Sequence, residues 1–60
     1  GTTYTFLTWT QVSNPQPGDV AVNENHCGIC IGGGQMIHAA DYGIGVIVGP
    51  VQSGMIYVRY

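Results

Sequence analysis

Residues 24–41, E-N-H-C-G-I-C-I-G-G-G-Q-M-I-H-A-A-D, decide the fold of this chain and hold both histidines and both cysteines. Residues 27–31 and 35–40 are short apolar runs typical of β-strands, and three glycines lie between them. Glycine readily adopts the positive φ that tight hairpin turns need. The stretch therefore predicts a β-hairpin whose loop is the three glycines.

The length of the loop fixes which residues share a side of the sheet. With a three-residue loop Cys30 faces Met36, and facing residues project to the same side. One side then carries His26, Gly28, Cys30, Met36, His38 and Ala40. The other carries Cys27, Ile29, Ile31, Ile37 and Ala39 and, being almost wholly apolar, is expected to be the core face.

The two histidines are the candidate catalytic residues. In this register His26 and His38 are diagonal neighbours, with Cα atoms roughly 7–8 Å apart, and Gly28 leaves space between them. Imidazole titrates near neutral pH, so such a pair can hold or orient a proton for a nucleophile. The alternative is a loop-edge His26 and a half-buried strand His38 without chemistry. A two-residue turn would separate the pair onto opposite faces.

The order of motifs in residues 16–39, P-G-D-V-A-V and then H-C-G-I-C-I-G-G-G-Q-M-I-H-A, resembles the second half of the NlpC and p-sixty cell-wall cysteine peptidases. The resemblance covers about residues 16–48. By position His26 matches the family's catalytic histidine and His38 its third, orienting residue. The resemblance implies the β half of an α+β papain-like domain. It also implies hydrolysis of the γ-D-glutamyl–diamino acid bond of peptidoglycan stem peptides, in a secreted or cell-wall-associated protein of a bacterium or phage.

The chain departs from the family pattern in three places. Cys27 stands where the family usually has valine, and Cys30 where it usually has tyrosine. The family's nucleophile is a cysteine that begins a helix in an aspartate-cysteine-serine-glycine context, upstream of every residue shown here. We therefore expect a companion chain or segment to carry the nucleophile, and this chain alone to be inactive.

The cysteines and histidines also allow other readings. Cys27 and Cys30 lie three residues apart on a predicted strand and so project to opposite faces, which disfavours a disulfide or shared metal ligation. Cys30 is a poor nucleophile because no helix N-terminus lowers its pKa. A hairpin that binds a metal through His26, Cys30 and His38 remains a hypothesis, and so does a non-catalytic β module that binds cell-wall peptide or a protein. We expect no cofactor and no metal.

Length and composition limit the class of protein. Sixty residues make one small partial domain, with an edge segment and turn over 1–15 and the sheet core over 16–60. The formal charges are Asp19, Glu24, Asp41 and Arg59, which excludes a basic nucleic-acid surface. The hydrophobic fraction of 45% is too high for a disordered acidic segment. No apolar run is long enough to span a membrane.

The remaining segments complete the predicted sheet. Residues 1–12 are expected to be extended, with Trp9 as an apolar anchor, and 13–19 to form a turn capped by Asp19. Strands follow at 20–22, at 45–48 as a buried strand that Gly49-Pro50 breaks, and at 55–60. No helix is expected, and Asp41 is only a weak candidate as a histidine partner. The sequence therefore predicts a mainly β chain, an antiparallel sheet of about five short strands.

Overall fold

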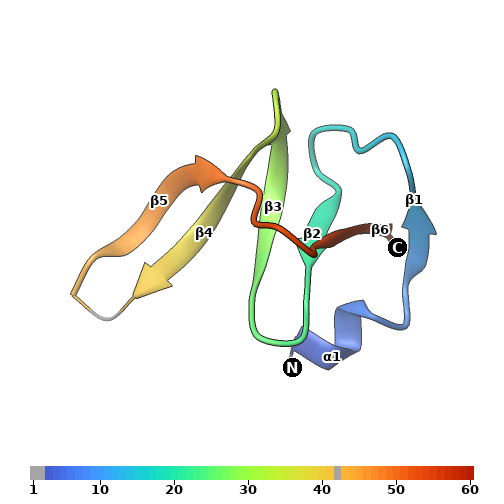
Figure 1. The fold of residues 1–60 in the computed structure, drawn as a ribbon, viewed down its shortest axis with the longest axis horizontal. Helices are drawn as coiled ribbons and strands as arrows, with labels where there is room; N and C mark the ends of the chain where they lie inside the picture. The colour runs from blue at the N-terminus through green and yellow to red at the C-terminus, as the bar shows by residue number, and fades with distance from the viewer. Residues whose placement is uncertain (1–2, 42) are drawn as a thin grey trace.

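A computed structural model describes residues 3–41 and 43–60, and the chain is mainly β, as predicted. The described residues form one helical turn and six strands, which in chain order are α1 (Thr3–Phe6), β1 (Thr10–Val12), β2 (Val20–Val22), β3 (Cys27–Gly32), β4 (Gln35–Asp41), β5 (Gly45–Pro50) and β6 (Ile56–Arg59) (Figure 1). The strands pair into one antiparallel sheet in the order β1-β6-β2-β3-β4-β5. The last strand of the chain therefore lies inside the sheet, between β1 and β2.

The glycine triplet forms a tighter turn than predicted but keeps the predicted register. Cys30 faces Met36 and Ile29 faces Ile37, as a three-residue loop requires. The turn itself is two residues, Gly33 and Gly34, with φ of 65° and 75°, and the pairing shifts by one residue between Cys30 and Gly32. This irregularity, with Gly32 at a φ of 97°, compensates for the shorter turn. The two-residue turn therefore does not place the two histidines on opposite faces of the sheet.

Two faces of the sheet need names. The side that carries Ile29, Ile31, Ile37, Val46 and Val48 is called the aliphatic face, and the side that carries Gly28, Cys30, Met36 and His38 the histidine face. The prediction that the aliphatic face of the hairpin is the core was wrong, because Ile29, Ile31 and Ile37 are exposed. The buried hairpin residues lie on the opposite side, where Cys30 is 4% and Met36 0% exposed.

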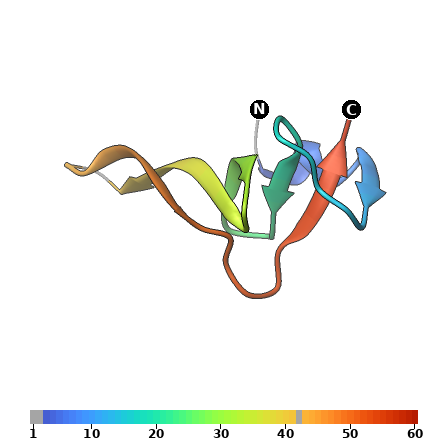
Figure 2. The same ribbon diagram turned by 90° about the horizontal axis from the view of Figure 1, so that it is seen from above.

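The layers that cover the sheet explain this reversal. On the histidine face, Val51, Met55 and Tyr57 from β6 and the connection before it pack against Ala21, Cys30 and Met36. On the aliphatic face, Phe6 and Trp9 pack over β2 and β6, against Val20, Val22 and Val58. Figure 2 shows α1 and the connection from β5 to β6 on opposite sides of the sheet. The aliphatic face over β3, β4 and β5 therefore lacks a described covering layer.

The N-terminal segment differs from the extended stretch predicted for residues 1–12. A helical turn, α1, precedes Trp9, and only the edge strand β1 is extended. Trp9 is the apolar anchor that was predicted, since it meets Phe6 edge-on at a centroid distance of 4.8 Å and packs against the β2 and β6 valines. The sequence could not predict this helix, because a helix of a single turn is too short to show an apolar periodicity.

Strand β5 also differs from its prediction. Residues 45–48 were expected to be buried and to end at Gly49-Pro50, yet β5 continues through Pro50 and most of it is exposed. A proline is tolerated here because β5 lies at the edge of the sheet, where no further described strand needs its missing N–H. An apolar run predicts burial only where another layer is present to cover it.

Asp19 ties the turn before β2 to the last strand. Its Oδ2 accepts a hydrogen bond from the Gln16 backbone N–H at 2.8 Å, which confirms the predicted cap. The Arg59 guanidinium donates to both carboxylate oxygens at 2.7 Å, a bidentate pair. These donors, Arg59 first, lower the pKa of Asp19 from 3.8 to about 2. The carboxylate thus joins residues 40 positions apart in the chain.

We expect this pair to make the stability of the chain depend on pH in the acid range. Because the folded-state pKa of about 2 lies below the ordinary value of 3.8, the stabilisation is complete above about pH 4 and is lost as the pH falls toward 2. Urea unfolding at several pH values measures the effect. In Asp19→Asn this part of the pH dependence should disappear, and an unchanged slope in that variant would contradict the assignment.

Candidate functional site

The loop before β3 places His26 at the end of the hairpin opposite the glycine turn. The side-chain oxygen of Asn23 accepts hydrogen bonds from the backbone N–H groups of Asn25, at 2.9 Å, and His26, at 2.8 Å. The Asn23 N–H donates in turn to the His26 carbonyl at 3.0 Å. Asparagine is suited to such a turn because its short amide competes well for nearby backbone groups. Asn23 therefore holds the backbone from which the His26 ring projects.

His38 comes from the middle of β4, and its ring extends toward β5. It faces Ile47 in the strand pairing, and its Nε2 lies against Gly49, where a Cβ would be 3.0 Å from that nitrogen. A side chain at position 49 would have to displace the ring. Gly49 therefore gives His38 the space in which it lies, a role that the sequence analysis did not assign to it.

The two imidazoles meet, as the predicted register required. His26 Nε2 and His38 Nδ1 are 2.7 Å apart, and the ring centroids are 4.9 Å apart at an interplanar angle of 77°. Both side chains are half-buried. The predicted space at Gly28 is instead filled by Met36, whose Sδ would lie 2.5 Å from a Cβ at position 28. The histidines thus touch each other at the end of the hairpin, with Met36 packed beside Gly28.

The distance between the rings defines how protons can be arranged. A nitrogen-to-nitrogen contact of 2.7 Å is a hydrogen bond, so one nitrogen carries the hydrogen and the other is an acceptor. If His26 donates from Nε2, its Nδ1 has a lone pair and can accept a proton from another group. His38 then carries its hydrogen on Nε2. In this tautomer the hydrogen bond to His38 fixes the orientation of the His26 ring.

Neither cysteine offers an exposed thiolate to this pair. Cys27 packs against the valine cluster of the aliphatic face, and Cys30 lies among the buried residues of the histidine face, so they point to opposite sides as predicted. Burial first, and the charge of Asp19 second, raise the pKa of Cys30. A buried thiol with a raised pKa is a weak nucleophile at neutral pH. The geometry agrees with the expectation that Cys30 is not the nucleophile.

The proposed metal site on the hairpin finds no support in the described part of the chain. Over residues 3–41 and 43–60, no group of three His, Cys, Asp or Glu side chains comes together closely enough to hold a metal ion. Cys30 therefore does not join the two histidines as a third ligand. The side chain of Asp41, the other candidate partner of a histidine, lies outside the described part of the structure.

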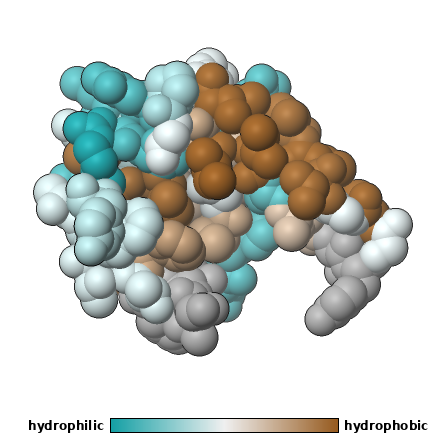
Figure 3. Space-filling model, turned by 180° about the vertical axis from the view of Figure 1, so that it is seen from behind, coloured by the Kyte–Doolittle hydropathy of each residue, from teal (hydrophilic) through white to brown (hydrophobic). Residues whose placement is uncertain are grey.

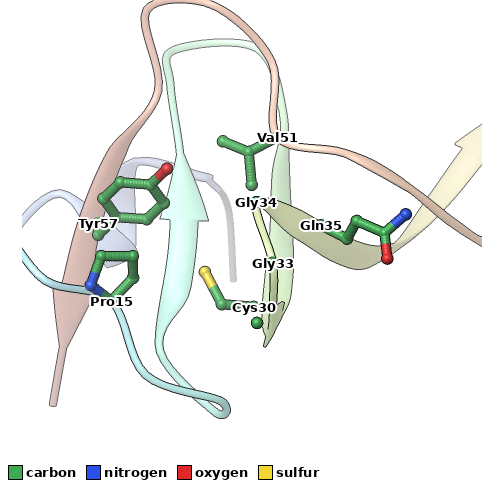
Figure 4. A pocket seen from close by; sticks show the side chains of 8 residues that line it. Pro15, Cys30, Gly33, Gly34, Gln35, Val51 and Tyr57 are labelled. Atoms are coloured by element: carbon green, nitrogen blue, oxygen red, sulfur yellow. The ribbon is translucent and has the colours of Figure 1, made fainter.

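A small hollow opens on the histidine face beside the glycine turn (Figure 4). It measures about 50 Å³ and is lined by Pro15, Cys30, Gly32, Gly33, Gly34, Gln35, Val51 and Tyr57. This is room for one or two water molecules and not for a peptide. This hollow could not be predicted from the sequence, because its lining residues Pro15, Val51 and Tyr57 come from segments far apart in the chain. The role of Asn23 in the turn, in contrast, could have been predicted from the sequence, because asparagine side chains often accept hydrogen bonds from backbone N–H groups two or three residues further along.

Family models, curated proteins and solved structures were compared with this chain, and none of them matches it. Within the described residues, no helix has the length and apolar character needed to cross a membrane.

Proposed function

We propose that this chain is the histidine-bearing part of a cysteine peptidase that cleaves peptidoglycan stem peptides at the γ-D-glutamyl–diamino acid bond. The observation that carries the proposal is the 2.7 Å hydrogen bond between His26 Nε2 and His38 Nδ1. It joins the two residues whose positions in the sequence match the catalytic and orienting residues of the NlpC and p-sixty pattern. The nucleophile comes from a companion segment or chain, because Cys27 and Cys30 are packed into the two core clusters.

The roles of the two histidines follow from the nitrogens that they use. His26 accepts the proton of the companion's thiol at Nδ1 while its Nε2–H donates to His38. The thiolate attacks the γ-D-glutamyl carbonyl, and the amide C–N bond breaks as the leaving amine takes the proton from His26. Water then hydrolyses the thioester, with His26 again accepting the proton. His38 holds the His26 ring in the useful tautomer and touches neither the thiol nor the substrate.

A second candidate function is a non-catalytic β module that binds cell-wall peptide or a protein. Five exposed aliphatic side chains on one face of the sheet favour it, since large exposed apolar patches commonly mark interaction sites. It requires nothing of the histidine pair beyond a structural hydrogen bond. Turnover separates the two functions, because a binding module retains stem peptide without cleaving it.

The experiment begins with native mass spectrometry of the purified protein, followed by a denaturing mass of every component and alkylation with iodoacetamide. We expect the assembly that contains a thiol-reactive companion cysteine to release a diamino-acid peptide from stem peptide, and alkylation to abolish this release. The chain without that companion should release none. Release by the chain alone, or an inert assembly in which the reactive cysteine is intact, would rule out the proposed division of the active site.

A further inference from the structure

The two facing nitrogens of the histidine pair have the separation of two ligands on one metal ion. His26 Nε2 and His38 Nδ1 are 2.7 Å apart. A bond between a metal ion and an imidazole nitrogen is about 2.0–2.1 Å long, so two nitrogens at right angles on one ion are about 2.8–3.0 Å apart. On a tetrahedral ion the same two nitrogens are about 3.3–3.4 Å apart. The pair therefore fits right-angled positions with little movement, and fits tetrahedral positions less well.

The hairpin holds the two rings together without an ion. His26 directly precedes β3, His38 lies in the middle of β4, and these two strands are paired. The Asn23 side chain accepts a hydrogen bond from the His26 N–H and so fixes the backbone that carries this ring. When one of two linked groups has bound an ion, the other is already close to it, and the pair binds more tightly than either group alone. The hairpin thus presents the histidines as a chelating pair.

Each ring has to turn for the hydrogen bond to become a chelate. In the hydrogen bond the two nitrogens point at each other, whereas in a chelate both lone pairs point at a common third position. The torsion about the Cβ–Cγ bond of histidine is soft, and both rings are half-buried. Gly49 lies beside His38 Nε2 and has no side chain to block the turn. The hydrogen of His26 moves from Nε2 to Nδ1, and His38 keeps its hydrogen on Nε2.

Water supplies the remaining ligands of such an ion. Within residues 3–41 and 43–60, no third His, Cys, Asp or Glu side chain joins the two histidines. Cys27 follows His26 in the chain, but it packs against the valine cluster of the aliphatic face. Figure 3 shows that face of the sheet, where hydrophobic side chains gather over β3, β4 and β5. The ion therefore approaches the pair from the histidine face.

We propose that His26 Nε2 and His38 Nδ1 bind one divalent transition-metal ion of the Ni²⁺ and Cu²⁺ class. These ions bind imidazole well and favour square-planar or tetragonal geometry, in which neighbouring ligands lie at right angles. With two protein ligands the ion is exchangeable and is not a resident cofactor. The binding does not depend on the proposed peptidase function. Under that function the bound ion prevents catalysis, because the His26 hydrogen then occupies Nδ1, the atom that accepts the thiol proton.

Isothermal titration calorimetry of the chain with NiCl₂, in a buffer that does not bind metals, tests the proposal. Ni²⁺ is the probe because the chain has free cysteines, which Cu²⁺ oxidises. We expect one Ni²⁺ per chain above the background of the double variant that combines His26→Ala with His38→Ala. Each single variant should raise the dissociation constant at least about tenfold, since one imidazole then binds alone. His38→Gln, whose amide can still bond to His26, should act like His38→Ala and replaces it if that variant fails to fold.

The matched control is Cys27→Ser, because Cys27 is the neighbour of His26 and packs on the opposite face of the sheet. It should change the dissociation constant less than about threefold. A tenfold loss in Cys27→Ser would show ligation by the thiolate and overturn the histidine chelate. Single variants that keep the wild-type affinity, or a wild-type titration equal to that of the double variant, would overturn it as well. A failure of the peptidase proposal leaves this test unaffected, because the titration uses the chain without companion or substrate.

Discussion

Under the proposed peptidase function, replacing His26 by alanine in the assembly with its companion is expected to lower kcat/KM for stem-peptide cleavage by roughly 10³-fold or more. In the proposed mechanism the companion thiol then has no base and the leaving amine has no acid, whereas peptide binding does not use the ring. The loss should therefore appear in kcat, with KM nearly unchanged. Steady-state release of the diamino-acid peptide measures it. The fold should survive, because the His26 side chain is half-buried and belongs to neither core cluster.

Two control variants separate catalysis from structure. His38→Ala should cost less, roughly 10–100-fold in kcat, and should change the pH profile, because the His26 ring loses the hydrogen bond that sets its tautomer. Asn25→Ala should leave turnover unchanged, since Asn25 is exposed and its hydrogen bond to Asn23 is donated by the backbone N–H, which alanine keeps. A His26→Ala enzyme with wild-type turnover would show that the imidazole pair is structural.

Gly28→Ala, which adds one methyl group, is expected to lower the free energy of unfolding more than any other glycine-to-alanine change in the hairpin. A Cβ at this position would lie 2.5 Å from Met36 Sδ, 2.9 Å from Met36 Cγ and 3.1 Å from the Ile37 carbonyl oxygen. Met36 is fully buried and cannot swing into solvent to relieve the overlap. Overpacking of this kind typically costs about 1–3 kcal/mol of the free energy of unfolding. Urea unfolding followed by far-UV circular dichroism measures the loss.

The role of Met36 in this effect can be isolated with a second substitution. Met36→Ala alone should be destabilising, by about 2–5 kcal/mol, because it leaves a cavity in the core of the histidine face. The double variant with Gly28→Ala should lose less unfolding free energy than the two single variants lose together. The new methyl group partly fills the cavity, and the missing Met36 side chain removes the overlap. Additive costs, or a Gly28→Ala chain as stable as the wild type, would contradict the contact.

The hairpin and the meeting of the histidines could be predicted because both depend on local sequence. Three consecutive glycines restrict the turn, and the parity of the strands then decides which residues share a face. The sequence could not reveal that the turn is two residues long. The pairing shift near Gly32 absorbs the difference and keeps Cys30 opposite Met36. The same register results from either arrangement, so the error in the turn did not affect the placement of His26 and His38.

The core face could not be predicted because it depends on segments that are distant in the chain. The alternation in β3 and β4 shows two apolar faces, Ile29 and Ile37 on one and Cys30 and Met36 on the other. Hydrophobicity alone favoured the isoleucines. The choice depends on Val51 and Tyr57, which pack on the histidine face, and on Trp9, which packs against the β2 and β6 valines on the other face. None of these contacts has a signature in the hairpin itself.

The position of β6 between β1 and β2 sets the order in which a newly synthesised chain can fold. The hairpins of β3 with β4 and β4 with β5 join neighbouring segments and can form while translation continues. Among the described strands β1 pairs with β6 alone, and Asp19 can form its ion pair only after Arg59 has been made. The ribosome must therefore complete residues 56–59 before β1 gains its backbone partner. Until then β2 is a sheet edge that a neighbouring nascent chain could join, so folding and aggregation compete until β6 has been made.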